Sequence, residues 1–181
     1  ENIITNTNAT FLQNINVGVA ITAGKLGIGF TDSEVKIGNT ALDSLTTGAS
    51  NTAVGHNALT ANTTGNYNTA VGRESLESNT TASDNTAIGF RALESNTTGS
   101  DNVAVGSGAL DVNTTGHSNV AVGHDSLDAN TTGDENVGIG MKALTSNTTG
   151  ENNTAVGAYS LNASTTASNN TAIGRAALTA N

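Results

Sequence analysis

Hydrophobic and polar positions follow one fixed order along this chain, and the order repeats every seventeen residues. Each repeat contains a glycine and, four residues later, a leucine. The glycines are Gly38, Gly55, Gly72, Gly89, Gly106, Gly123, Gly140, Gly157 and Gly174, and the leucines are Leu42, Leu59, Leu76, Leu93, Leu110, Leu127, Leu144, Leu161 and Leu178. A fixed period of this length predicts a solenoid, in which each repeat buries its apolar side only against its neighbours.

The first part of the repeat predicts one short β-strand. Counting from the asparagine that opens residues 51–67, position 1 is Asn, position 2 Thr or Val, position 3 Ala or Gly, position 4 Val or Ile and position 5 Gly. Positions 2 and 4 share one face of a strand. We expect position 4, represented by Val54, Val71 and Ile88, to form a fully buried inner row, with position 2 partly buried. The small residue at position 3 predicts close approach of another backbone or chain.

The second part of the repeat has its constrained residues at positions 5, 8, 9 and 12, which is helical spacing. We favour a short helical turn per repeat, and a turn followed by a second strand is the alternative. Thr-Thr-Gly and two variable polar residues then form a loop. Because identical positions stack about 4.8 Å apart, Asn at positions 1 and 12 predicts hydrogen-bonded ladders of buried side chains.

The chain divides into two parts. Residues 1–33 are expected to form an entry or capping segment, with short alternating strands at 16–19 and 25–29. A third such piece, 34–38, opens the solenoid of seventeen-residue repeats, which covers 34–181 and stops in mid-repeat. Because the chain begins at Glu1 without Met, we expect it to be a piece of a longer polypeptide.

Large side chains are scarce: the sequence has three Phe, two Tyr, one Met and no Trp. Each repeat offers mainly one Val or Ile and one Leu, at about 1.5–3 kcal/mol per buried side chain. That barely offsets the cost of ordering seventeen residues. We therefore predict a parallel homotrimer, in which strands of different chains pack closely along the Ala/Gly row.

The formal net charge of −9 argues against nucleic acid as a partner. The sequence contains no Cys, which excludes disulfides and thiolate metal sites. Its apolar runs are too short to span a bilayer, so we expect no membrane insertion.

The strand motif Asn-[Thr/Val]-[Ala/Gly]-[Val/Ile]-Gly resembles the repeat of trimeric autotransporter adhesin heads. The longer form Asn-Thr-Ala-Val-Gly-x-x-Ala-Leu-x-x-Asn-Thr-Thr-Gly is similar to repeats of bacteriophage tail-fibre proteins and related bacterial surface proteins. Residues 24–29, Gly-Lys-Leu-Gly-Ile-Gly, resemble a motif that often precedes them. The resemblance covers residues 16–181. It implies a left-handed parallel β-roll, a trimer, and an extracellular place on a virion fibre or bacterial cell surface. The repeat here is longer than that of the adhesin heads, so their coil cross-section does not carry over.

Catalytic chemistry is not indicated, because a repetitive sequence offers no unique acid, base and nucleophile set. His56 and His124 occupy the same repeat position about 19 Å apart, and with His117 they are expected to be solvated. The acidic residues Asp101, Asp134, Glu135 and Glu151 are expected to be solvated loop residues. We therefore expect no enzyme, no cofactor and no metal. The Asn-Thr-Thr triplets match a glycosylation acceptor, but a ladder already explains them.

Residues that vary between repeats are the candidate contact surface for a cell-surface glycan or receptor. They are Tyr67, Phe90, Arg91, Met141, Lys142, Tyr159 and Arg175. We expect the chain to act as the shaft or head segment of an extracellular fibre, giving extension and multivalent cell-surface attachment. The competing hypothesis is a monomeric ice- or surface-binding β-solenoid, which would use a threonine ladder such as Thr63/Thr64 and Thr80/Thr81.

Overall fold

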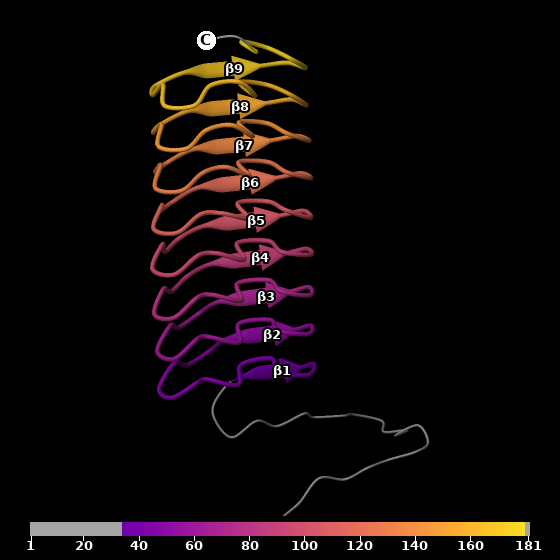
Figure 1. The fold of residues 1–181 in the computed structure, drawn as a ribbon, viewed down its shortest axis with the longest axis vertical. Helices are drawn as coiled ribbons and strands as arrows, with labels where there is room; N and C mark the ends of the chain where they lie inside the picture. The colour runs from indigo at the N-terminus through magenta and orange to yellow at the C-terminus, as the bar shows by residue number, and fades with distance from the viewer. Residues whose placement is uncertain (1–33, 180–181) are drawn as a thin grey trace, which may run out of the picture.

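The computed structural model describes residues 34–179, which form one elongated stack of parallel β-strands (Figure 1). The prediction of a capping segment at 1–33 lies outside the described residues. The nine strands follow one another in chain order within a single sheet. They are β1 (Val35–Ile37), β2 (Thr52–Val54), β3 (Thr69–Val71), β4 (Thr86–Ile88), β5 (Val103–Val105), β6 (Val120–Val122), β7 (Val137–Ile139), β8 (Thr154–Val156) and β9 (Thr171–Ile173).

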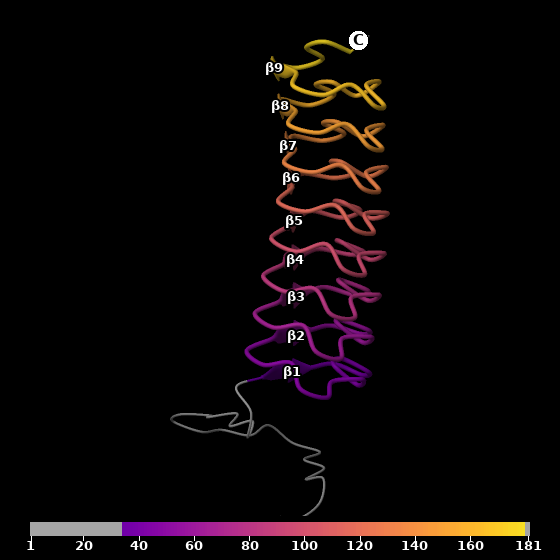
Figure 2. The ribbon, with the colours of Figure 1, turned by 90° about the vertical axis from the view of Figure 1, so that its left-hand side faces the viewer.

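Each seventeen-residue repeat makes one turn of the solenoid. Strand pairing joins residues seventeen apart, as in Thr52 with Thr69, so identical positions stack directly above one another. Seen from the side, the strands form one wall and the turn segments after them form the other (Figure 2). The predicted parallel β-solenoid is therefore confirmed.

The predicted helical turn is absent from residues 34–179, where the segment after each strand is a series of turns. The reason is the backbone at positions 7 and 9. Asn57 has φ of 59° and Leu59 φ of 52°, and the equivalent residues of every other repeat are likewise left-handed. A right-handed helix needs negative φ at both positions, so the spacing of apolar residues arises from a turn that folds back on the strand.

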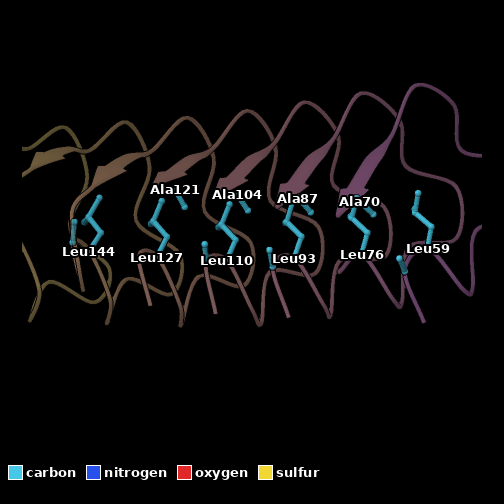
Figure 3. Packing of buried hydrophobic residues seen from close by; sticks show 14 of the residues in the cluster. Leu59, Ala70, Leu76, Ala87, Leu93, Ala104, Leu110, Ala121, Leu127 and Leu144 are labelled. Atoms are coloured by element: carbon cyan, nitrogen blue, oxygen red, sulfur yellow. The ribbon is translucent and has the colours of Figure 1, made fainter. Parts of the chain in front are cut away.

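After each strand the chain folds back along it, and we call positions 8–12 of the repeat the returning segment. The core is the narrow space between the strand and this segment (Figure 3). It contains Ala at position 3, Ala or Ser at position 8 and Leu at position 9. From Leu59 to Leu161, seven leucines in successive repeats are completely buried. Each fully buried leucine contributes about 1.5–3 kcal/mol, and together they form one continuous apolar column.

The expected inner row at position 4 is wrong, because the strands present the opposite face to the core. Ala53 is fully buried, whereas Val54 and Val71 are only partly buried and Ile88 is 41% exposed. The leucine leaves too little room for a branched side chain on the inner face. At Gly138, an added Cβ would lie 2.6 Å from Oγ of Ser126 and 3.3 Å from Cγ of Leu127. The row of small residues thus reflects a narrow core within one chain and gives no evidence of a second chain.

The predicted asparagine ladders at positions 1 and 12 are confirmed. Along the first ladder, Oδ1 of Asn51 accepts hydrogen bonds from the backbone N–H and from Nδ2 of Asn68, at 3.0 and 3.2 Å. Along the second, Nδ2 of Asn79 donates to Oδ1 of Asn62 at 3.0 Å. The carbonyl oxygen of Ala82 accepts from both Asn68 and Asn79. The ladders therefore satisfy buried backbone groups as well as one another.

The glycine at position 5 closes the strand where two backbones approach closely. Gly55 has φ of 142°, and a Cβ placed on it would lie 2.3 Å from the carbonyl oxygen of Gly72. A side chain is excluded both by this contact and by the backbone conformation. This explains why glycine occupies position 5 in every repeat.

Candidate assembly surface and its flanking charges

The outer side of the nine-stranded sheet carries two parallel rows of β-branched residues, which we call the strand face. It consists of positions 2 and 4 of each strand. Ile88 and Ile139 are 41% and 40% exposed, and the threonines and valines between β2 and β8 are partly buried. In the middle strands β5, β6 and β7 both rows are aliphatic, whereas position 2 is Thr in β2 to β4 and in β8 and β9. Both rows are aliphatic in β1 as well, through Val35 and Ile37, so the face is most apolar in the middle strands and at its first strand.

The strand face is large enough to mark an interaction surface. Three residues at about 3.3 Å each and nine strands about 4.8 Å apart give a strip roughly 10 Å wide and 38 Å long. Its footprint of about 400 Å² lies within the range of the largest apolar patch on a typical monomeric protein, which is often a functional surface. A single chain leaves this strip in contact with solvent.

The predicted contact residues lie mainly at the corner that follows each strand, at positions 6 and 7. Phe90 is 44% exposed, and the guanidinium groups of Arg73 and Arg91 lie 5.5 and 6.0 Å from the centre of its ring. Arg175 lies 6.0 Å from the ring of Tyr159. These stacked pairs place aromatic and cationic groups together at two heights of the solenoid.

The remaining candidates do not join these clusters. Met141 and Lys142 occupy the corner three repeats above Phe90 and Arg91, about 14 Å away along the stack. Tyr67 is 64% exposed at position 17, which precedes a strand and therefore lies beyond the opposite end of the strand face. The seven candidates thus do not converge on one pocket-like site.

A column of carboxylates runs along the returning segment at position 10. Glu77, Glu94, Asp111 and Asp128 occupy this position in four successive repeats. The guanidinium group of Arg91 pairs with Glu94 and lies 3.5 Å from Oδ2 of Asp111. One cation is thus shared by two carboxylates of the column.

Two members of the carboxylate column, Asp111 and Asp128, have raised pKa values, chiefly because they are partly buried. Burial raises the pKa of Asp111 to about 7, and a hydrogen bond with Glu94 acts in the same direction against the opposing charge of Arg91. Burial also raises the pKa of Asp128, as does the nearby charge of Asp125. The hydrogen bond to Glu94 raises the pKa of Arg91. Sequence analysis did not identify this column, although a row of acids exactly seventeen residues apart was the available signal.

Three carboxylates at the lower end of this region, those of Glu74, Glu77 and Glu94, have oxygen atoms within 4.8 Å of one another. Oxygen ligands of this kind suit hard cations. Each of the three already has a donor in the chain, because Arg73 contacts Glu74, Asn57 donates to Glu77 and Arg91 donates to Glu94. The arrangement is accounted for as a polar network.

The histidines have different surroundings. His56 and His124 are exposed at the corner, and His124 lies 3.1 Å from Asp125. His117 instead takes part in a side-chain ladder at position 16, where its Nδ1 accepts a hydrogen bond from the backbone N–H of Ser100. Asparagines of the Asn-Thr-Thr triplets from Asn62 to Asn147 are completely buried, so the folded chain does not present them as glycosylation acceptors.

Within residues 34–179, no helix has the length and apolar character needed to cross a membrane. Comparisons of the chain with protein-family models, with curated proteins and with solved structures find no match.

Proposed function

We propose that this chain is a structural segment of an extracellular fibre, assembled as a parallel homotrimer through the strand face. The observation that carries the proposal is the pair of outward β-branched rows, which run without interruption along nine strands. Burial of such a strip against identical strips would remove it from water and add to the modest core of each repeat. Three-fold order rests on the resemblance of the repeat to those of trimeric fibre and adhesin proteins.

The proposed role is extension and display. A stack in which every turn adds about 4.8 Å makes a rod whose length is set by the number of repeats. The exposed aromatic and cationic residues at the corners, such as Phe90 and Arg91, are offered at several heights along the rod and again on each copy. Weak contacts with a cell-surface glycan or receptor would then be multiplied by valency.

The mass of the chain in solution tests the proposal. We expect about 54 kDa by native mass spectrometry, three times the 18.0 kDa of one chain. Val105→Asp places a charge at the centre of the strand face and should dissociate the trimer, because burial of unpaired carboxylates is costly. Far-UV circular dichroism should remain that of the parent, since Val105 points away from the core of its own chain. Thr115→Asp, in the same repeat but on an exposed loop, is the matched control and should leave the mass unchanged.

A folded monomer at micromolar concentration would contradict the proposal. It would favour the second candidate function, ice or surface binding by a single solenoid. The observation in favour of that candidate is that positions 2 and 4 provide two outward rows, one of them rich in threonine. The threonine ladder at positions 13 and 14 is less suitable for this role. The hydroxyl of Thr63 donates to the carbonyl oxygen of Thr80, so its proton is already used within the chain. Thermal hysteresis would be expected of an ice-binding monomer, and its absence would exclude that function.

A further inference from the structure

The loops that precede the strands are joined by side chains at position 16. The side chain at this position accepts a hydrogen bond from the backbone N–H at position 16 of the repeat below. Asn66 accepts in this way from Ala49 at 2.9 Å, and Ser83 accepts from Asn66 at 3.0 Å. The same bond recurs higher in the stack, from Glu151 to Ser168 at 2.9 Å. We call this row the loop ladder, and its members share the ability to accept a hydrogen bond.

His117 lies in the middle of the loop ladder. Its Nδ1 accepts from the backbone N–H of Ser100 at 3.1 Å, and its own backbone N–H donates to Oδ1 of Asp134 at 2.7 Å. An imidazole nitrogen accepts only when it carries no proton, so this bond requires the neutral ring with its proton on Nε2. The amide, hydroxyl and carboxylate oxygens that accept in the other repeats keep a lone pair whether or not they are protonated.

A proton on Nδ1 of His117 would convert the acceptor into a donor that faces the N–H of Ser100. Histidine is the side chain whose charge ordinarily changes between about pH 5 and pH 8, and this ring is exposed to solvent. The titratable groups of the two loops stacked against it are Asp101 below and Asp134 and Glu135 above, and neither loop contains Lys or Arg. All three groups are carboxylates, which can accept a hydrogen bond from the protonated ring when it turns away from Ser100.

Loss of this one bond has a local effect, because other bonds hold the two loops together. The N–H of Thr97 donates to the carbonyl oxygen of Thr114 at 3.0 Å, and the N–H of Ser118 donates to the carbonyl oxygen of Ser100 at 3.1 Å. These bonds join backbone groups, which do not titrate. Once His117 is protonated, the N–H of Ser100 is left to water and the segment around it opens more often.

We propose that His117 is a pH-sensitive latch in the loop ladder. The neutral ring fastens loop 97–101 to loop 114–118, and the protonated ring releases it. Mild acid would therefore loosen the solenoid at one height and leave the loop ladder of the other repeats closed. The inference concerns contacts within a single chain, so it does not depend on the proposed assembly.

Amide hydrogen exchange followed by NMR tests the latch locally, because the melting temperature also responds to Asp111. After correction for the intrinsic exchange rate, the protection of the Ser100 amide should fall about tenfold as the pH is lowered from about 7.5 to about 5. The amide of Asn66, which donates to the hydroxyl of Ser83, is the internal control and should keep its protection. His117→Asn supplies an amide oxygen, as Asn66 does in its own repeat, and should abolish the fall at Ser100.

A matched variant and a second measurement complete the test. His124→Asn removes an exposed histidine that lies outside the loop ladder, so the fall at Ser100 should remain. NMR of protein carrying isotope-labelled histidine should place the proton of the neutral His117 ring on Nε2, and this measurement needs no variant. A proton on Nδ1 of the neutral ring would overturn the inference. Constant protection of Ser100 in the parent, an equal fall at Asn66, or the same fall in His117→Asn would also overturn it.

Discussion

Asn147 is the last asparagine of the ladder at position 12. Its Nδ2 donates to Oδ1 of Asn130 at 2.9 Å, as in earlier repeats. The next repeat has Ser164 in place of asparagine, and the shorter side chain does not reach it. Oδ1 of Asn147 and Oγ of Ser164 are consequently both buried without a hydrogen-bond partner, which costs about 1–3 kcal/mol for each such group.

Ser164→Asn should therefore stabilise the chain. The new amide would donate to Asn147 as Asn79 does to Asn62, and the free energy of unfolding should rise by about 1–2 kcal/mol. Urea unfolding followed by circular dichroism measures the change. Thr166→Asn, at an exposed position of the same repeat, is the control and should have no effect, whereas Asn113→Ser should lower stability. An unchanged midpoint for Ser164→Asn would show that the ladder contributes nothing at this position.

At the residue scale, the sequence predicts the asparagine ladders correctly because their chemistry depends only on stacking. It does not predict which face of the strand is buried. The pattern Thr52-Ala53-Val54 has period two and allows either face inward, and the more hydrophobic residue is the natural choice. The correct choice depends on Leu59, which folds back over the strand and fills the core. That contact is invisible until the path of the returning segment is known.

At the scale of the element, the returning segment makes the stability of the folded chain depend on pH. The carboxylate column places Asp111 between Glu94 and Asp128, with Arg91 as the facing cation. Because the pKa of Asp111 is raised to about 7 in the folded chain, the folded state binds a proton more tightly than the unfolded state does. Stabilisation from this group is thus complete below the ordinary carboxyl range near pH 4 and is lost as pH rises towards 7.

We expect the melting temperature to fall between pH 4 and pH 8, through the titration of Asp111. Asp111→Asn keeps the shape of the side chain and removes its ionisation, so its melting temperature should depend less on pH and exceed that of the parent at pH 8. Melting curves at a series of pH values measure both effects. Asp101→Asn alters an exposed acid of the same region and is the control, with both variants compared in the monomeric Val105→Asp protein. A parent curve that rises between pH 4 and pH 8 would contradict the assignment.

The sequence pattern predicted a helical turn in the returning segment, and the reason for this error can be stated. Apolar residues at positions 5, 8, 9 and 12 match a helix, but they match any compact turn that returns to the same core. Arg91 and Leu93 both have left-handed φ, and neither residue type signals that conformation. Non-glycine residues adopt it only when the surrounding structure compensates its cost. Here the compensation is the burial of the leucine column, which is a property of the stack.

For the whole molecule, the repeat is the unit of both length and stability. Removal of residues 102–118 deletes one complete turn and should leave a folded, shorter solenoid, since each turn contacts only its neighbours. Removal of residues 110–125, one residue fewer, joins Ala109 to Ser126 and places one extra residue before the buried leucine of that turn, so that the leucine misses its place in the core and the melting temperature should fall sharply. Circular dichroism and thermal melting distinguish the two. Equal behaviour of the two deletions would show that stacking in register is not what holds the chain together.

The assembly surface was only partly accessible from sequence. Candidate residues chosen for their variability, such as Phe90 and Met141, lie at the corner beside the strand face, but Tyr67 lies at its other edge. The edges themselves emerge only when each position is placed relative to the ends of a strand.

The parallel register of the strands also determines how such a rod would respond to pulling. Its interstrand hydrogen bonds run along the stack, as between the N–H of Gly72 and the carbonyl of Val54 at 2.8 Å. Axial tension therefore loads one turn at a time, and turns would detach singly from an end. Each detached repeat exchanges about 4.8 Å of height for seventeen extended residues, a gain of roughly 50–55 Å. Optical tweezers should record equal steps of this size, and a fibre built in this way would lengthen under load before it breaks.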